Sequence, residues 1–224
     1  MTPIRVGLVG TGYAAKVRAE NLVADARSQL VAIVGRDRTR TQEFAQPFET
    51  EVLSDWPALL RRDDIDLVVI STINREHGAI AQAALEADKH VVMEYPLALD
   101  VAEAERLIAL AAARHRLLHV EHIELLSGIH HAIAQALPEI GTPTYVRYSN
   151  INPQQPAPLT WTYQLDQFGF PLMGAVSRIH RLTALFGQVS HVSCQARYQP
   201  NANNPAFFAT CLCSAQLSFA SGLV

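Results

Sequence analysis

The chain has 224 residues, of which 49% are hydrophobic and 17% are charged, and this composition is ordinary for a soluble globular protein with a sizeable core. The formal net charge of −3 gives no support to a nucleic-acid or anionic-membrane partner, because both bind through basic patches. The longest stretch without Asp, Glu, Lys or Arg, residues 198–224, contains three asparagines and two prolines, which excludes a bilayer span there. We therefore expect a cytoplasmic protein.

The first half of the chain alternates between strand-like and helical segments. Each predicted strand is a continuous apolar run, as expected when helices cover both faces of a parallel sheet. The predicted strands are residues 4–10, 30–35, 67–71, 90–93 and 117–120, and the predicted helices are residues 13–24, 39–45, 76–87 and 101–114, the last with Asp100 as its N-cap. The alternation predicts an α/β fold in which residues 1–122 form a doubly wound, dinucleotide-binding Rossmann domain.

The pattern changes in the second half. Helices are predicted at residues 125–137 and 172–186, and half-buried antiparallel strands at residues 142–150, 189–198 and 209–220. We expect residues 123–224 to form an α+β domain built on an open antiparallel sheet. Ser221 and Gly222 indicate a turn, and Leu223 and Val224 the start of another strand. Because natural sheets avoid an unpaired edge of this kind, we expect a truncated form of a longer protein.

A glycine-rich turn follows the first predicted strand. Gly10, Gly12 and Ala15 fit the pattern G-x-G-x-x-[G/A], between a strand and a helix. Gly10 allows the tight turn, Gly12 lets the backbone approach a pyrophosphate, and the helix N-terminus at Tyr13 and Ala14 offers free N–H groups. The alternative is a structural glycine turn. The strand–turn–helix context favours a dinucleotide site.

The second predicted strand ends at Arg36 and Asp37, the place where such enzymes recognise the ribose. An acidic residue there binds the ribose hydroxyls of NAD, whereas arginine favours the 2′-phosphate of NADP. Asp37 could point at the ribose instead, and both residues could belong to a solvated charge cluster. We predict NADPH as the cofactor, with NADH as the alternative.

A polar segment follows the predicted strand at residues 67–71. Ligands of open α/β sheets bind outside the carboxyl ends of the strands, so Thr72 and Asn74 are candidates for cofactor contact. Asn74 could equally be only the N-cap of the next helix. His77, taken alone, is more typical of a structural or surface residue.

Four titratable residues, His119, Glu121, His122 and Glu124, lie close together in the sequence. On a strand, His119 and Glu121 share a face and His122 lies opposite, so no single-metal geometry follows. We expect this group to line the mouth of the cleft.

The cysteines are Cys194, Cys211 and Cys213. No second cysteine pair or suitably spaced histidine pair completes a metal site, and no metal is expected. We interpret the cysteines as reduced thiols in the core.

Several further segments complete a pattern that reaches nearly the whole chain. Its general part is Gly10-x-Gly12, Thr72-x-Asn74-x-x-His77 and Glu94-x-Pro96, and its specific part is residues 94–97, 119–126, 161–163, 168–171, 177–179 and 185–187. With these residues the chain resembles the glucose–fructose oxidoreductase/inositol dehydrogenase superfamily. Within it, the chain is most similar to the biliverdin reductases of the cyanobacterial type.

The chain departs from the sugar dehydrogenases of that superfamily at three positions. Tyr95 stands where they carry lysine, and matching a later helix by its end at Gly187 puts Met173 at their aspartate and Ser177 at their histidine. Oxidising an alcohol needs a general base that takes the hydroxyl proton as the hydride leaves. Sugar dehydrogenation is therefore not expected.

The resemblance implies NADPH-dependent reduction of biliverdin to bilirubin by hydride transfer to the central methine bridge. It places Arg178 in the substrate pocket, and Arg181, at i+3, can project from a neighbouring position, with His122 as a further substrate contact. We expect Arg178 to orient the pigment and to deliver or relay the proton. Its alternative is a surface arginine on an amphipathic helix.

The other expected catalytic residues are Tyr95 and Glu94, and Glu94 is also expected to contact the cofactor. Tyr95 would form the pocket wall or aid proton supply, because a phenol is a poor base at neutral pH but a serviceable hydrogen-bond donor. The remaining alternatives are a non-catalytic member of the superfamily that senses a nucleotide or ligand, and a sugar-type oxidoreductase with relocated catalytic residues. No oligomeric state is predicted.

Overall fold

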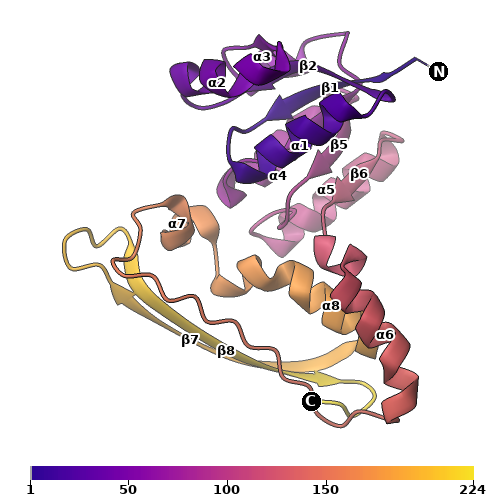
Figure 1. Ribbon diagram of the computed structural model, residues 1–224, viewed down its shortest axis with the longest axis vertical. Helices are drawn as coiled ribbons and strands as arrows, with labels where there is room; N and C mark the ends of the chain where they lie inside the picture. Colours follow the sequence, from indigo (N-terminus) through magenta and orange to yellow (C-terminus); the bar gives the residue numbers. More distant parts are fainter. Residues whose placement is uncertain (1) are drawn as a thin grey trace. The chain divides into compact units, whose positions relative to one another are not determined.

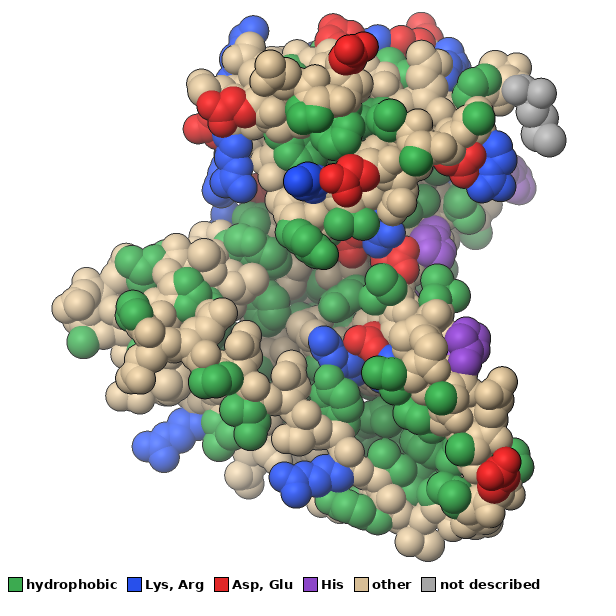
Figure 2. All heavy atoms as spheres, viewed as in Figure 1, with side chains coloured by type: hydrophobic (Ala, Val, Ile, Leu, Met, Phe, Trp, Pro, Cys, Tyr) green, Lys and Arg blue, Asp and Glu red, His purple; other side chains and the backbone are tan. Residues whose placement is uncertain are grey.

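The structure, a computed structural model, describes residues 2–224. The chain divides into two compact units, Met1–Glu121 and His122–Val224, each of which is shown with its elements in Figure 1. On the face drawn in Figure 2, basic and acidic side chains are interspersed over the N-terminal unit, in keeping with the small net charge. None of the helices within residues 2–224 is long and apolar enough to cross a membrane.

The N-terminal unit is built on one parallel sheet with the strand order β3-β2-β1-β4-β5-β6. The strands are β1 (Ile4–Val9), β2 (Ser28–Val34), β3 (Glu51–Val52), β4 (Leu67–Ile70), β5 (His90–Met93) and β6 (Leu118–Val120). The order reverses between β1 and β4, so the loops that leave these two strands diverge to opposite sides. A crevice at the carboxyl ends of the strands is where doubly wound folds bind their ligands.

Helices cover both faces of this sheet and bury alternate residues of each strand. They are α1 (Tyr13–Ala24), α2 (Arg38–Ala45) with the short η1 (Gln46–Phe48), α3 (Trp56–Leu60), α4 (Asn74–Glu86) and α5 (Val101–Ala113). In β1, Leu8 belongs to the cluster with Ala15 and Ala19 of α1, whereas Val9 belongs to the cluster with Leu85 of α4. This alternation explains the continuous apolar strands of the sequence.

The predicted elements of this unit are confirmed to within a few residues at their ends. Asp100 is the N-cap of α5, since its side chain accepts a hydrogen bond of 2.9 Å from the Glu103 N–H. Two short elements, β3 and α3, were not predicted from the sequence. A strand of two residues shows no periodicity, and α3 is a single turn started by Asp55, whose carboxylate accepts from the Ala58 N–H at 2.7 Å.

The C-terminal unit contains one long antiparallel ribbon, β7 (Val189–Pro200) and β8 (Phe208–Phe219), together with helices. The helical elements are η2 (Ile123–Leu126), α6 (Gly128–Ile140), η3 (Trp161–Tyr163), α7 (Leu165–Phe168), η4 (Pro171–Ala175) and α8 (Val176–Phe186). Phe186 at the end of α8 packs edge-on against Phe219 of β8, with 6.0 Å between ring centroids. The unit is α+β, as predicted.

Two expectations for this unit are wrong. Residues 142–150 form no regular strand, because the hydrogen bonds that pair their backbone, from Val146 N–H and to Thr144 O, both involve the single residue Val224. A strand needs a ladder of partners, which alternation in the sequence cannot guarantee. The cysteines are free, but Cys194 and Cys211 are exposed rather than in a core. The turn at Ser221-Gly222 is confirmed, with Gly222 at a φ of 89°.

Candidate active site

The glycine-rich turn leaves β1 and enters α1 with the geometry that a dinucleotide requires. Gly10 has a φ of 129°, and a Cβ there would lie 2.1 Å from the Ser71 carbonyl oxygen, so only glycine fits. A Cβ on Gly12 would meet nothing within 4 Å. Gly12 is also the N-cap of α1 and has no side chain that could cap the helix. No N-cap side chain therefore occupies the N–H groups in the first turn of α1, and the backbone at Gly12 can be approached closely.

The residues around the turn fit a bound dinucleotide. Ala15 is fully buried against the sheet, whereas Tyr13 is 87% exposed and Ala14 half-buried at the open side. Ser71, at the carboxyl end of β4, is 7% exposed, and its hydroxyl finds no partner among the residues that the structure describes. An orphaned buried hydroxyl beside an open turn is a group that a ligand can satisfy.

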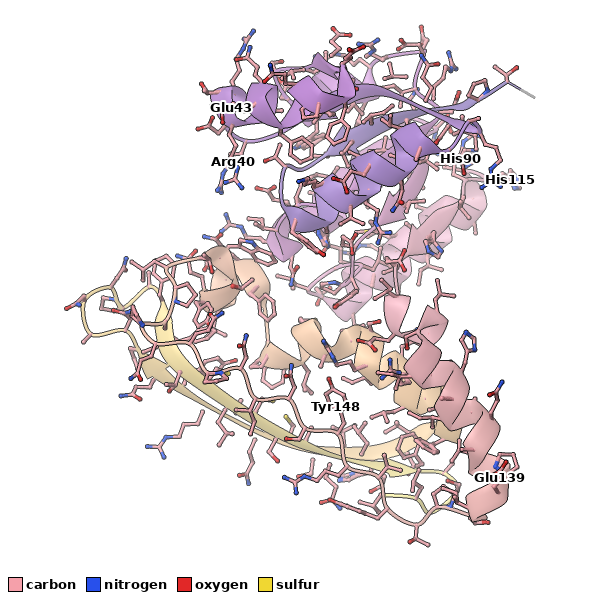
Figure 3. The ribbon with its side chains drawn as sticks, in the orientation of Figure 1. Arg40, Glu43, His90, His115, Glu139 and Tyr148 are labelled. Carbon is pink, nitrogen blue, oxygen red and sulfur yellow. The ribbon has the colours of Figure 1, made fainter. Side chains whose placement is uncertain are left out.

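Asp37 and Arg36 have different surroundings at the end of β2. The Asp37 carboxylate caps α2 by accepting a hydrogen bond of 2.9 Å from the Arg40 N–H, so its side chain is turned to the helix. Arg36 is exposed, and Arg40, drawn in Figure 3, adds a second exposed guanidinium on α2. This arrangement leaves cations, rather than the carboxylate, to meet the ribose side of a nucleotide.

His77 joins the loop after β4 to the loop after β5. Its ring is fully buried, with Nδ1 2.7 Å from the Pro96 carbonyl oxygen and Nε2 3.3 Å from the Thr72 carbonyl oxygen. Burial lowers the pKa of His77, which favours the neutral ring. A neutral ring has one N–H, and the shorter contact assigns it to the Pro96 side. The surface alternative for His77 is therefore wrong.

Asn74 is 5% exposed and is the first residue of α4, whose N-cap is Ile73. The alternative that Asn74 serves only as the N-cap is therefore wrong. Thr72 is half-buried just before it, at the carboxyl edge of the sheet.

Arg18, which was not predicted as a site residue, joins the ends of β5 and β6. Arg18 of α1 donates from Nε to Glu94 Oε1 at 3.0 Å, and its Nη2 lies 3.2 Å from Glu121 Oε2. The three side chains are 14–25% exposed. Tyr95, half-buried, follows Glu94 directly. The sequence feature that could have identified Arg18 is its position on α1, three residues after Ala15 and so on the buried side of the helix. A cation at such a position needs a carboxylate partner.

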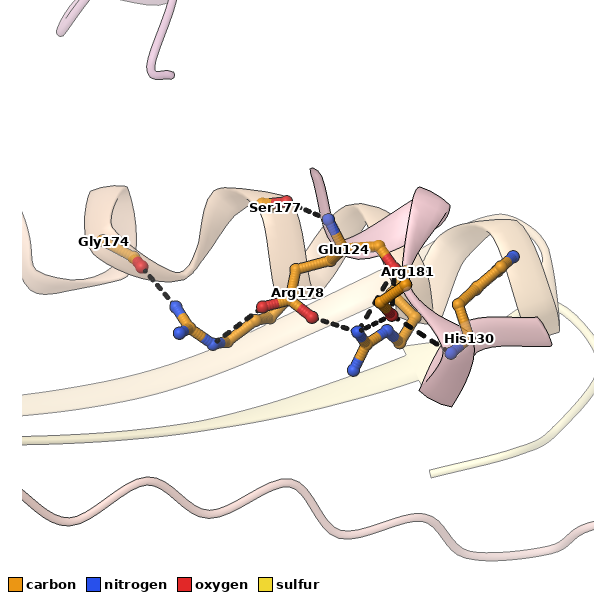
Figure 4. A network of polar contacts seen from close by, with 7 residues as sticks. Glu124, His130, Gly174, Ser177, Arg178 and Arg181 are labelled. Atoms are coloured by element: carbon orange, nitrogen blue, oxygen red, sulfur yellow. Dashed lines mark hydrogen bonds and ion pairs between the residues drawn. The ribbon is translucent and has the colours of Figure 1, made fainter. Parts of the chain in front are cut away.

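The candidate arginines of the C-terminal unit share one carboxylate, as Figure 4 shows. Glu124 Oε1 lies 3.7 Å from Arg178 Nε, and Glu124 Oε2 contacts Arg181 Nη2. Arg181 Nη2 also donates to the Ser127 hydroxyl at 2.9 Å, and its side chain is only 10% exposed. Arg178 is 28% exposed and donates to the Gly174 carbonyl oxygen at 2.9 Å. The more accessible guanidinium is therefore that of Arg178.

The positions matched to the sugar dehydrogenases carry no base in this chain. Ser177 is fully buried, and its hydroxyl accepts a hydrogen bond of 3.3 Å from the Glu124 N–H. Met173 lies in η4, one turn before Ser177.

Two aromatic contacts involve the candidate substrate residues. His122 packs edge-on against His180, with 4.5 Å between ring centroids. The ring of Tyr148 lies 6.0 Å from the Arg178 guanidinium.

Comparisons with known proteins find relatives over most of the chain. The structure of biliverdin reductase from Synechocystis sp. PCC 6803, in complex with biliverdin and NADP+, is 54% identical to this chain at a TM-score of 0.96 and covers 99% of this chain and 70% of that one. Biliverdin reductase A of Mus musculus is 31% identical over 188 residues, which are 84% of this chain and 60% of the mouse protein. A 3-ketoreductase from Actinomadura kijaniata, in complex with NADP and TDP-benzene, is 28% identical at a TM-score of 0.80, covering 99% of this chain and 68% of that one.

The family assignment covers both units. Residues 4–122 match the family described as an oxidoreductase family with an NAD-binding Rossmann fold, and residues 135–224 match its C-terminal alpha/beta domain. The chain spans 60% of the length of the mouse relative. The chain therefore belongs to the GFO/IDH/MocA family of oxidoreductases.

Proposed function

We propose that the protein is an NADPH-dependent biliverdin reductase that forms bilirubin by hydride transfer to the central methine bridge. The observation that supports this most is the 54% identity, over 99% of the chain, to a biliverdin reductase whose structure holds biliverdin and NADP+. That identity extends over both units, so it supports more than a shared fold.

The cofactor would be held by the N-terminal unit. The N–H groups at Gly12, Tyr13 and Ala14 would bind the pyrophosphate, and Arg36 the 2′-phosphate. The other contacts would come from the carboxyl edge of the sheet, at Gly10, Asp37, Thr72, Asn74 and Glu94. The fully buried His77 would act indirectly, by holding the loop that carries Thr72. When bound, NADPH supplies the hydride. Because the Asp37 carboxylate caps α2, the choice between NADPH and NADH would rest on Arg36.

The C-terminal unit would bind the pigment through Arg178. A guanidinium suits the propionates, the lactam oxygens and the π-face of a tetrapyrrole, and 28% exposure leaves it within reach of a ligand. Arg178 would orient the pigment and deliver or relay the proton to a pyrrole nitrogen, with Tyr95 aiding the proton supply and His122 as a further contact. Arg181 would act indirectly by holding Glu124, because its guanidinium is already engaged there.

Reduction of a pigment fits this chain better than oxidation of a sugar. An alcohol oxidation needs a base, and the three positions that would supply one hold Tyr95, Met173 and Ser177. Ser177 in addition is fully buried and accepts from the Glu124 N–H. Reducing a conjugated methine bridge needs instead a hydride and one proton, which the proposed residues can supply.

Mixing the purified protein with NADPH and biliverdin tests this proposal. We expect the absorption of biliverdin to give way to that of bilirubin, with one NADPH consumed per pigment. A TDP-linked ketosugar serves as the comparison substrate and should leave NADPH unconsumed. Tight NADPH binding without turnover of either substrate would support a non-catalytic protein that senses a nucleotide or ligand. Turnover of the ketosugar alone would support a sugar-type oxidoreductase. Each of these results would contradict the proposal.

A further inference from the structure

Two carboxylates are fixed side by side at the carboxyl edge of the N-terminal sheet. The backbone of Glu94 continues the β4–β5 ladder, with its N–H donating to the Ile70 carbonyl oxygen at 3.0 Å. Glu121 does the same one strand along, donating to the Met93 carbonyl oxygen at 2.8 Å. Both side chains therefore start from rigid positions, and Arg18 holds their carboxylates together.

Arg18 also connects this pair to the turn that would bind the pyrophosphate. It lies six residues after Gly12 on α1, about 9 Å along the helix axis. The first helical hydrogen bond, from the Lys16 N–H to the Gly12 carbonyl oxygen, is 3.0 Å and anchors the start of this helix. One rigid helix thus carries both the phosphate-facing turn and the guanidinium that organises the carboxylates.

The formal charges of Arg18, Glu94 and Glu121 do not cancel. Two carboxylates and one guanidinium have a formal charge of −1, and only 14–25% of each side chain is exposed, so solvent screens this charge incompletely. The His119 Nε2 lies 4.0 Å from Glu121 Oε2, and the His119 side chain is 54% exposed. The edge is therefore a mildly negative site with a fixed geometry.

The nicotinamide ring is neutral in NADPH and carries a positive charge in NADP+. A fixed negative charge near the ring favours the oxidised form, and a hydride donor becomes more strongly donating when its oxidised form is stabilised. We propose that Arg18 is a positioning residue that sets this charge, and so sets the relative affinity of the protein for NADP+ and NADPH. This inference rests on the proposed function for the place of the ring at the carboxyl edge.

The test is the ratio of the dissociation constants for NADPH and NADP+, measured by titration of each nucleotide. Arg18→Gln makes the formal charge of the site more negative, from −1 to −2. We therefore expect NADP+ to gain about tenfold in affinity over NADPH, the order of magnitude for one partly screened unit charge. Glu121→Gln makes the site neutral, and we expect a shift of similar size in the opposite direction. Arg18→Lys keeps the charge and should keep the ratio within about threefold of the wild type.

Lys16→Gln is the matched control, because it removes a cation from the exposed face of the same helix, where Lys16 lies 3.9 Å from Glu20. Its ratio should equal that of the wild type. Adenosine 2′,5′-bisphosphate, which lacks the nicotinamide, should bind all variants equally and shows that the phosphate site is intact. An unchanged ratio in Arg18→Gln, or shifts of the same sign in Arg18→Gln and Glu121→Gln, would overturn the inference. If Arg18→Gln does not fold, the sign of the Glu121→Gln shift decides. Failure of the wild type to bind either nucleotide would instead overturn the proposed cofactor.

Discussion

Arg178 and Arg181 lie three residues apart on α8, but they differ in exposure and in hydrogen-bond partners, which indicates different roles. Arg181 is 10% exposed and is engaged by Glu124 and Ser127, which is typical of a buried cation that organises its neighbours. Arg178 shares Glu124 only at 3.7 Å and remains 28% exposed. The sequence could place both residues on one helix, but helical spacing cannot say which guanidinium a carboxylate has already taken.

We predict that Arg178→Ala lowers kcat for biliverdin about 100-fold, the usual contribution of a positioned proton donor. The dissociation constant of NADPH should stay within about twofold, because the proposed cofactor contacts all belong to the N-terminal unit. Steady-state kinetics and a nucleotide titration measure the two effects. Arg197→Ala, at an exposed position on β7, is the matched control and should leave both unchanged. Normal turnover by Arg178→Ala would remove this residue from the mechanism.

Among single residues, those that the backbone conformation requires could be predicted from the sequence. Those whose role depends on a partner distant in the sequence could not. Gly10 was predictable because the turn has a backbone requirement, and its φ of 129° bears this out. Arg18 was missed because its two partners, Glu94 and Glu121, follow strands that are far away in the sequence. Asp37 could cap a helix or face a ribose, and only the 2.9 Å bond from the Arg40 N–H decides between these roles.

At the scale of elements, α4 is tied to the loop after β5 by one buried side chain. His77 lies on the first turn of α4 and contacts both the Pro96 and the Thr72 carbonyl oxygens. Burial outweighs these two contacts and lowers the pKa of His77 in the folded protein. The same ring in the unfolded chain has a pKa of about 6.5.

This difference predicts a stability that is lost in acid. Below about pH 6.5 the unfolded chain binds a proton that the folded protein does not, so the free energy of unfolding falls as the pH drops. The slope is at most about 1.4 kcal/mol per pH unit for one group. In urea titrations between about pH 8 and pH 5, the wild type should therefore lose its advantage over His77→Gln as the pH falls. Parallel pH profiles for the two proteins would contradict this account.

The elements themselves were predictable where burial imposes a period. The longer strands of the parallel sheet are mainly apolar because helices cover both faces, and the helices end near their predicted limits. The segment at residues 142–150 alternates like a strand, but among the described residues its backbone pairs only with Val224. Pairing depends on a partner strand, which a local pattern does not contain. β3 and α3 are too short to show a hydrophobic period in the sequence.

At the scale of the whole molecule, the proposed cofactor and substrate contacts come from different units. The N-terminal unit carries the features that fit a dinucleotide, and the C-terminal unit carries the candidate pigment contacts. The division at Glu121 and His122 falls inside the predicted group of titratable residues, so this group contributes Glu121 to one unit and Glu124 to the other. The sequence alone indicated the fold class from periodicity. The proposed substrate followed only from the resemblance, because no spacing of residues encodes a tetrapyrrole.

The most direct test of the proposed function follows the hydride itself. NADPH that carries deuterium at the transferred position of its nicotinamide is mixed with biliverdin and the protein, and the product is examined by mass spectrometry and NMR. We predict bilirubin with one deuterium, located on the carbon of the central methine bridge. Bilirubin without deuterium, or with deuterium at another carbon, would contradict hydride transfer to that bridge.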